Sequence, residues 1–240
     1  MLSYNKLKAR PRDFLAATSL TLDEFQQLLP AFQSAYEQRY PYELTRAGKP
    51  HQRRAGGGAK GILQGFEDQL LFILLYQKTN PLQTMHALQF GLSQPQANYW
   101  IQQLLPVLQE ALAALSFTPE RDASRLATSP LLCEGAPAGV IDGTERRRQR
   151  PTEAQRQKEH YSGKKKTHTD KNILLANEIT SKVAYLSPTV AGTTHDKKAA
   201  DKAKMTYAVN ATLDKDTGLQ GYEPERVLST QPKKSLRATH

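Results

Sequence analysis

The stretch GVIDGTERRRQRP, residues 139–151, turns from apolar to strongly basic within a few positions. Its first residues form a short apolar run that is typical of a buried strand, and Asp142 ends that run. Four arginines follow between positions 146 and 150. Because guanidinium groups bind phosphate through charge and paired hydrogen bonds, the stretch predicts a carboxylate at a strand end beside residues suited to a polyanion.

The sequence after residue 137 is typical of strands more than of helices. A basic and partly apolar helix is predicted at 195–205, and apolar or alternating runs predict strands at 138–142, 165–178, 182–188 and 211–216. Neighbouring strands followed by a helix and a further strand are typical of a mixed sheet with covering helices. We therefore expect an α/β domain over residues 138–240.

The chain before residue 117 has helical periodicity instead. Apolar residues at helical spacing predict helices at 21–40, 66–79, 82–90 and 93–115. Thr21 and Ser93 are suited to cap two of these helices, and Pro95 stands in a first turn, where its missing N–H is harmless. The predicted fold class is therefore α + α/β, a helical region followed by a mixed sheet.

A short turn at Gly91 separates the last two predicted helices. Three helices with a glycine in the turn before the last one favour a helix-turn-helix, which we place at about 66–105 within a DNA-binding region of residues 1–116. The last helix would expose side-chain amides that can pair with adenine edges, those of Gln94, Gln96 and Asn98. An ordinary helical bundle with a solvated polar face fits the same pattern.

Two segments lack a regular pattern. Residues 117–137 hold three prolines and have no clear period, which predicts a linker between the two regions. Residues 41–61 are rich in glycine and in basic side chains, among them Arg53, Arg54 and Lys60, and predict a loop.

The composition points to a polyanionic partner. The net charge is +10 and the isoelectric point is about 9.6, and basic side chains gain affinity for phosphates by releasing counterions. The single cysteine, Cys133, excludes an intramolecular disulfide and an all-cysteine metal site, and it fits a reducing cytoplasm. The apolar runs are far shorter than the ~20 residues that cross a bilayer, so we expect no membrane span.

Three aspartates stand at the ends of predicted elements. Asp142 and Asp216 end strands, and Asp196 begins a helix. Carboxylates that are brought together repel one another unless a cation lies between them, and hard divalent cations prefer such oxygen ligands. A metal held in this way supports phosphoryl transfer. Aspartate is equally ordinary in a turn or as a helix cap, so the spacing alone leaves both interpretations open.

Four ordered blocks carry a family resemblance: VIDGTERRRQRP, EHYSGKKKTHTDKNILL, YLSPTVAGTTHDKKAAD and DTGLQGY. They fall within residues 138–222 and resemble blocks of bacterial insertion-sequence transposases with a DDE superfamily endonuclease domain. The helices before them resemble the helix-turn-helix that these proteins carry upstream. The resemblance implies an RNase H-like mixed sheet and DNA transposition, by metal-dependent strand cleavage and strand transfer at the terminal repeats of the element.

The resemblance also implies residue roles. Asp142 and Asp196 would be the catalytic, metal-binding carboxylates and Asp216 a further metal ligand, with Mg²⁺ or Mn²⁺ as cofactor. DNA would be the partner, the chain would form a homo-oligomer during transposition, and it would reside in the cytoplasm with the nucleoid. Basic residues beside the metal would hold the DNA backbone: Arg146, Arg147, Arg148, Arg150, Lys164, Lys165 and Lys166.

The chain departs from the family after the Asp-x-Gly block. Family members place a catalytic glutamate on a helix well beyond this block, whereas Glu223 and Glu225 follow it closely and flank Pro224, and the sequence ends at His240. We therefore expect a C-terminally truncated transposase that is weak or inactive alone. The alternatives are a non-catalytic DNA-binding protein, perhaps an inhibitor of full-length transposase, and a basic RNA-binding protein.

Overall fold

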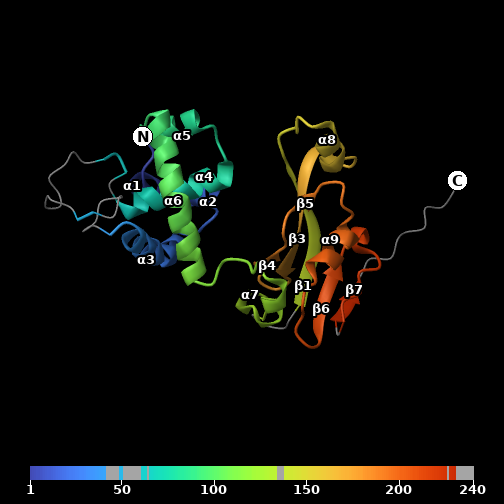
Figure 1. The fold of residues 1–240 in the computed structure, drawn as a ribbon. Helices are drawn as coiled ribbons and strands as arrows, with labels where there is room; N and C mark the ends of the chain where they lie inside the picture. The colour runs from blue at the N-terminus through green and yellow to red at the C-terminus, as the bar shows by residue number, and fades with distance from the viewer. Residues whose placement is uncertain (42–48, 51–60, 64, 134–137, 226, 231–240) are drawn as a thin grey trace. The chain divides into compact units, whose positions relative to one another are not determined.

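The structure, a computed structural model, describes residues 1–41, 49–50, 61–63, 65–133, 138–225 and 227–230. The chain divides into two compact units, Met1–Phe117 and Thr118–His240 (Figure 1). Arg53, Arg54 and Lys60 of the predicted basic loop lie outside the described residues, as does the segment 231–240. Within the described ranges, no helix is both long enough and apolar enough to cross a membrane.

The first unit is helical. Its helices are α1 (Tyr4–Leu7), α2 (Pro11–Thr18), α3 (Leu22–Arg39), α4 (Phe66–Thr79), α5 (Gln83–Phe90) and α6 (Gln94–Ala114). The last four begin and end within one residue of the helices predicted from the sequence. Thr21 and Ser93 cap α3 and α6 as predicted, because each side chain accepts a hydrogen bond from the backbone amide three residues later.

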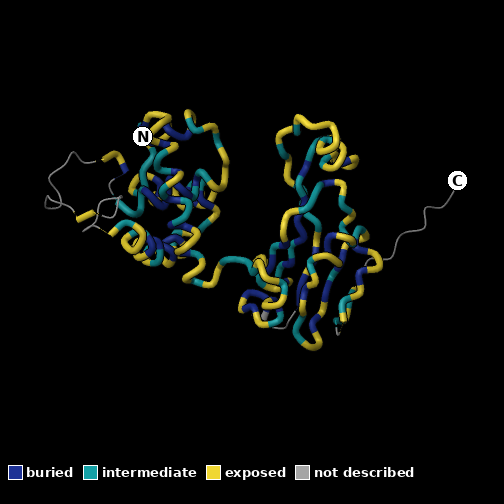
Figure 2. The backbone as a smooth tube through the Cα atoms, viewed as in Figure 1, coloured by how far each residue is buried: buried dark blue, intermediate teal, exposed yellow. Residues whose placement is uncertain are grey.

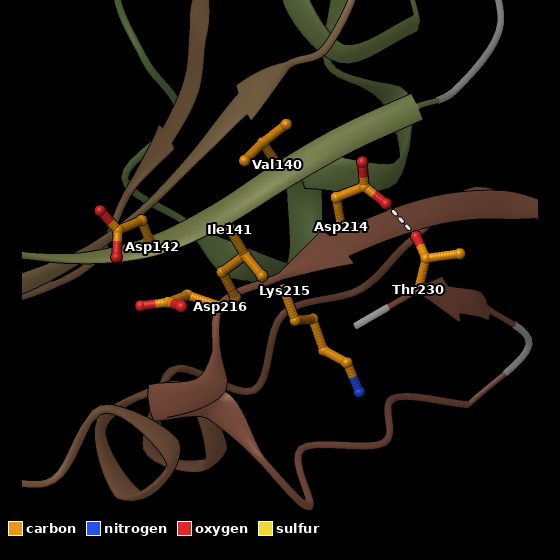
Figure 3. Close-up of a pocket in the computed structure, with 7 residues that line it drawn as sticks. All are labelled: Val140, Ile141, Asp142, Asp214, Lys215, Asp216 and Thr230. Carbon is orange, nitrogen blue, oxygen red and sulfur yellow. Dashed lines mark hydrogen bonds between the residues drawn. The ribbon is translucent and has the colours of Figure 1, made fainter. Parts of the chain in front are cut away.

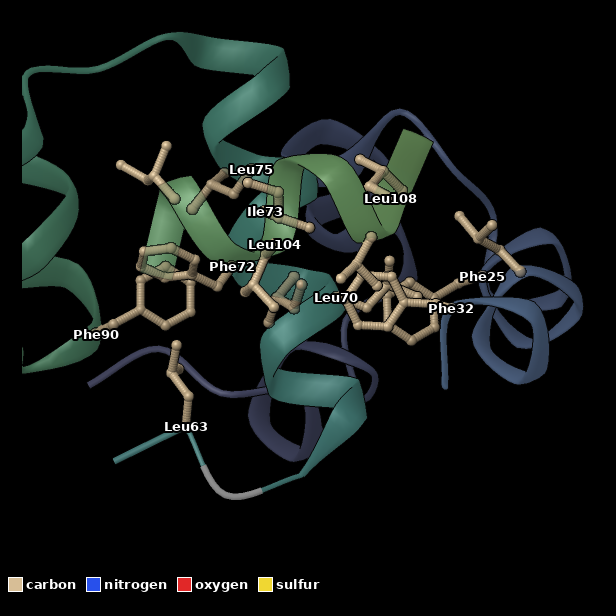
Figure 4. Close-up of a cluster of buried hydrophobic side chains, with 14 of the residues drawn as sticks. Phe25, Phe32, Leu63, Leu70, Phe72, Ile73, Leu75, Phe90, Leu104 and Leu108 are labelled. Carbon is tan, nitrogen blue, oxygen red and sulfur yellow. The ribbon is translucent and has the colours of Figure 1, made fainter. Parts of the chain in front are cut away.

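Helix α4 lies at the centre of this unit. Leu70, Leu71, Phe72 and Ile73 are consecutive and completely buried, so the helix is covered on every side (Figure 4). Helix α5 ends at Gly91, whose φ of 70° is left-handed, and the chain then turns directly into α6. This is the short turn that the sequence placed before the last helix.

The second unit contains a mixed sheet. Its strands are β1 (Ala138–Arg147), β2 (Tyr161–Ser162), β3 (Thr167–Asn177), β4 (Val183–Leu186), β5 (Val190–Ala191), β6 (Ala211–Lys215) and β7 (Val227–Thr230). The order is β2-β3-β1-β6-β7, and β4 and β5 pair with β3. Strand β1 runs antiparallel to β3 and parallel to β6.

Short helices complete the unit: α7 (Pro130–Cys133), α8 (Ala154–His160), α9 (Asp196–Ala203) and the 3-10 turns η1 (Ala123–Thr128) and η2 (Thr217–Leu219). A helical region followed by a mixed sheet with helices confirms the predicted fold class and is consistent with an RNase H-like sheet. Figure 2 shows buried stretches along the central strands, whereas α8 has no buried residue.

Strand β1 is longer than the strand predicted at 138–142. It continues to Arg147 because Gly143–Arg147 pairs with β3 throughout, from Gly143 opposite Ile173 to Arg147 opposite Thr169. This extension is polar and half exposed. A prediction based on the apolar run alone therefore ended the strand too early. Asp142 therefore lies within β1, at the point where its pairing with β6 stops.

The structure also differs from the linker predicted at 117–137. Leu126, Leu131 and Leu132 are buried in the same core as Ile141 of the sheet. The backbone amide of Glu120 donates to the carbonyl of Ala184 at 2.8 Å. Apart from Phe117, the described part of this segment therefore belongs to the second unit.

Candidate active site

Asp142 and Asp216 lie where two neighbouring parallel strands stop pairing. The register pairs Ile141 of β1 with Lys215 of β6, so the two aspartates are the next residues along their strands. Both line one pocket of about 620 Å³, and Figure 3 shows their carboxylates at the same end of it. The structure thus brings together two of the three predicted carboxylates.

Local backbone bonds orient both carboxylates. Asp142 Oδ1 accepts a hydrogen bond from the amide of Gly143 at 2.7 Å. Asp216 Oδ1 accepts one from the amide of Thr217 at 2.6 Å, because Asp216 caps η2. These bonds are the ones that aspartate makes in turns and caps. Both residues are exposed.

Lys215 carries its charge away from the two aspartates. Only 4% of the residue is exposed, and its Nζ donates to the carbonyl of Tyr222 at 2.6 Å and to Glu223 Oε1 at 2.9 Å. Figure 3 shows this ammonium pointing away from Asp216. Hydrogen bonds from Lys215 and Ser229, together with the charge of Lys215, lower the pKa of Glu223 below its usual value. Glu223 therefore pairs with Lys215.

Asp214 is a pocket residue that the sequence reasoning missed. It lies at the other end of the pocket from Asp216 and accepts a hydrogen bond from the hydroxyl of Thr230 on β7 (Figure 3). The signal was available, because residues two apart on a strand share a face and Asp216 was already a candidate. Its partner on β7 was not predicted.

Asp196 lies on the other side of β1. It begins α9, and Ala200 of this helix shares a buried core with Ile141. Since successive residues of a strand point to opposite faces, Ile141 points toward this core and Asp142 toward the other face of β1, and both residues contribute to the lining of the pocket. The carboxylate of Asp196 forms an ion pair with Lys171, at 2.7 Å between Oδ1 and Nζ.

Lys171 joins Asp196 to a second carboxylate, that of Glu145. Their Nζ and Oε1 atoms are 3.4 Å apart, and 6% of Lys171 is exposed. Burial by itself would raise the pKa of Glu145, but hydrogen bonds from Ser162 and Thr169 and the charge of Lys171 lower it below its usual value. This buried network could not be predicted from the sequence, because the register of β1 and β3 places Glu145 opposite Lys171.

The three aspartates predicted for one site are therefore not all found in the lining of the pocket. Asp142 and Asp216 share the pocket, whereas Asp196 is not among the residues that line it. Across the described ranges, no group of three or more histidine, cysteine, aspartate or glutamate side chains is arranged to hold a metal ion.

The basic residues predicted to contact DNA form two groups. Three arginines bond to neighbouring side chains, Arg146 to Thr189, Arg148 to Asp170 and Arg150 to Gln157. The others are exposed on β1 and on the turn that joins β2 to β3, namely Arg147, Lys164, Lys165 and Lys166. The second group offers accessible charge. Within the first group, Arg148 and Arg150 also stabilise the segment that contains α8 and connects β1 to β3, which we call the hairpin around α8.

The polar residues at the start of α6 form hydrogen bonds with α5 and with the cap of their own helix. Gln83 of α5 donates to Asn98 Oδ1 at 3.0 Å and accepts from Gln94 at 2.6 Å. Gln96 belongs to the capping box, where its Oε1 accepts from the amide of Ser93 at 2.9 Å. All three predicted DNA contacts are exposed, but Gln96 also has a structural role.

Each of the two units contains a segment that matches the model of a known protein family. Residues 63–114 match the family model described as the helix-turn-helix of DDE superfamily endonuclease, and residues 141–238 match that described as DDE superfamily endonuclease. No curated protein and no solved structure matches the chain. The two family matches together cover more than half of the chain and occur in the expected order. The chain therefore belongs to the DDE superfamily, as a transposase-like protein with a helix-turn-helix followed by an endonuclease domain.

Proposed function

We propose that this chain binds DNA through its helical unit and carries out metal-dependent strand cleavage and strand transfer, with Asp142 and Asp216 as the metal ligands. The observation that carries the proposal is their placement at adjacent positions of parallel strands, on one pocket. Lys215, the lysine that lines the pocket, donates a hydrogen bond to Glu223.

The carboxylates of Asp142 and Asp216 fit a hard divalent cation. Two exposed carboxylates supply oxygen ligands of the kind that Mg²⁺ and Mn²⁺ take, and such cations keep several waters as further ligands. A bound cation would supply charge stabilisation at the attacking and leaving oxygens of a phosphodiester. The protein's own contribution is to hold Asp142 and Asp216 at a fixed spacing through the bonds to Gly143 and Thr217.

The DNA partner follows from the family and from charge. Exposed Gln94 and Asn98 on α6 are suited to base edges, and Lys164–Lys166 on the β2–β3 turn are suited to phosphates. We propose the terminal repeats of a mobile element as the bound sites, cut by a homo-oligomer. Two ligands rather than three in the described pocket favour weak activity for this chain by itself.

A non-catalytic DNA-binding protein is the second candidate. It is favoured by the ion pair that holds Asp196 at Lys171, outside the pocket. Such a protein would occupy the same DNA sites without cutting them and would inhibit an active transposase. Binding to terminal-repeat DNA without nicking, at any Mn²⁺ concentration, would support this candidate.

The test combines metal binding with nicking of supercoiled DNA. We expect the full chain to bind Mn²⁺, detected by electron paramagnetic resonance, and to nick DNA that carries terminal repeats. Asp142→Ala and Asp216→Ala should each abolish both. The matched control is Asp201→Ala on α9, because Asp201 is an exposed aspartate that pairs with Lys197. Undiminished Mn²⁺ binding in both pocket variants would refute the proposal.

A further inference from the structure

The carboxylate of Asp196 lies against the backbone of two glycines. A Cβ atom built on Gly143 would be 2.6 Å from Asp196 Oδ1, and one built on Gly218 would be 2.8 Å from Asp196 Oδ2. Gly143 follows Asp142 directly, and Gly218 is two residues after Asp216. One side chain therefore touches both backbone segments that carry the pocket carboxylates.

The small size of glycine, rather than its backbone freedom, explains both positions. Neither has a φ in the left-handed region, so an alanine could adopt either backbone conformation. What excludes a larger residue is the close approach of Asp196. The glycines that follow the two pocket aspartates in the sequence are therefore explained by their contact with the carboxylate of Asp196, at the start of α9.

Lys171 compensates the charge of Asp196. Its Nζ is 2.7 Å from Asp196 Oδ1 and also donates to the backbone carbonyl of Thr194 at 2.8 Å. Asp196 Oδ1 is buried, and the ion pair offsets the cost of removing this oxygen from water. Because Lys171 belongs to β3 and Thr194 precedes α9, the pair ties the start of the helix to the sheet.

We propose that Asp196 is a positioning residue, which with Lys171 fixes the spacing of the strand segments that carry Asp142 and Asp216 and does not itself bind the metal. This rests on the proposed function of those two aspartates as metal ligands. Asp196 is not among the residues that line the pocket, its Oδ1 is paired with Lys171, and its carboxylate lies against Gly143 and Gly218.

The decisive experiment is a double-mutant cycle of Gly143→Ala and Asp196→Ala in the full chain. In the wild-type background the new methyl group overlaps the carboxylate, so Gly143→Ala should lower the unfolding temperature and weaken Mn²⁺ binding roughly tenfold or more, as loss of a positioning contact does. In the Asp196→Ala background the methyl group fills the vacated space. In that background Gly143→Ala should lower the unfolding temperature and the Mn²⁺ affinity little, or restore part of what Asp196→Ala loses.

A second variant, Asp196→Asn, tests the proposal even if Asp196→Ala folds poorly. Asp196→Asn keeps the shape between the glycines and an oxygen for Lys171, so we expect Mn²⁺ affinity close to wild type, within about threefold. A metal ligand would lose far more on this change. Loss of Mn²⁺ binding in Asp196→Asn, with additive effects in the cycle, would overturn the positioning role and make Asp196 a ligand.

The cycle also separates the two proposals. If the wild-type chain bound no Mn²⁺, the proposed metal site would fail. The unfolding temperatures of the four proteins would still decide the role of Asp196, because non-additivity between positions 143 and 196 supports the contact and additivity contradicts it. Gly218→Ala repeats the cycle on the β6 side.

Discussion

His86 is enclosed by aromatic rings in the helical unit. It is completely buried, and its ring centre is 4.2 Å from that of Phe72 and 5.2 Å from that of Phe90. Burial disfavours the charged imidazolium and lowers the pKa of His86 from its usual 6.5 to about 4. The unfolded chain therefore takes up a proton first as the pH falls. The stabilisation is complete above pH 6.5 and is lost as the pH falls toward 4.

We predict that His86→Phe removes this pH dependence. Between pH 8 and pH 5, protonation of the unfolded state should cost the wild type about 2 kcal/mol of unfolding free energy from this residue alone. The variant should lose correspondingly less. Urea unfolding of both proteins at the two pH values measures the difference, and an equal loss in both would contradict the assignment to His86.

At the same scale, the sequence placed Asp142 and Asp216 at one site, and the structure finds both in one pocket, whereas it does not place Asp196 among the lining residues. Spacing along the chain places all three at element ends. It does not say on which face of β1 a later helix packs. Ala200 and its neighbours on α9 decide that by joining the core around Ile141. The two-residue period of a strand then separates Asp142 from Asp196.

At the scale of elements, Gln96 at the start of α6 has two possible roles: it caps the helix, or it contacts DNA bases. If it acts through the capping box, Ser93→Ala and Gln96→Ala should each lower the unfolding free energy of the helical unit by about 1 kcal/mol. Both should change DNA affinity to a similar, small extent. Asn98→Ala, which leaves the cap intact, is the comparison. A large affinity loss confined to Gln96→Ala would show that the residue contacts bases.

The hairpin around α8 depends on Arg148. Its guanidinium donates to Asp170 at 2.9 Å and lies 3.2 Å from the ring nitrogens of His160. We predict that Arg148→Met loosens the hairpin, seen as faster proteolysis between residues 148 and 166, while Arg147→Met does not. Equal proteolysis of the two variants would mean that the pair with Asp170 contributes nothing measurable.

The long helices could be predicted because caps and apolar periodicity mark them, as at Thr21 and Ser93. Strands β2, β5 and β7 could not, since two to four residues show no period. The polar half of β1 was missed for a different reason. Its hydrogen bonds come from β3, so its extended conformation is set by pairing rather than by its own residues.

At the scale of the whole molecule, the net charge of +10 makes salt the simplest probe of DNA binding. The dissociation constant should rise steeply with salt, and the slope should fall by about 0.9 for each lysine that contacts a phosphate. Replacing Lys164, Lys165 and Lys166 by glutamine should therefore flatten the slope. Lys182→Gln, an exposed lysine on the β3–β4 turn, is the control. An unchanged slope in the triple variant would exclude this turn from the interface.

Strand β1 joins two different environments. From Ala138 to Ile141 its backbone pairs with β6 on one edge and β3 on the other, whereas from Gly143 to Arg147 it pairs with β3. Amide hydrogen exchange should therefore be slow before Asp142 and faster after it. Asp142 would then lie at the boundary between a rigid half of β1 and a more mobile basic half, so that the basic half can follow a bent DNA backbone while the rigid half keeps the proposed metal ligands in register.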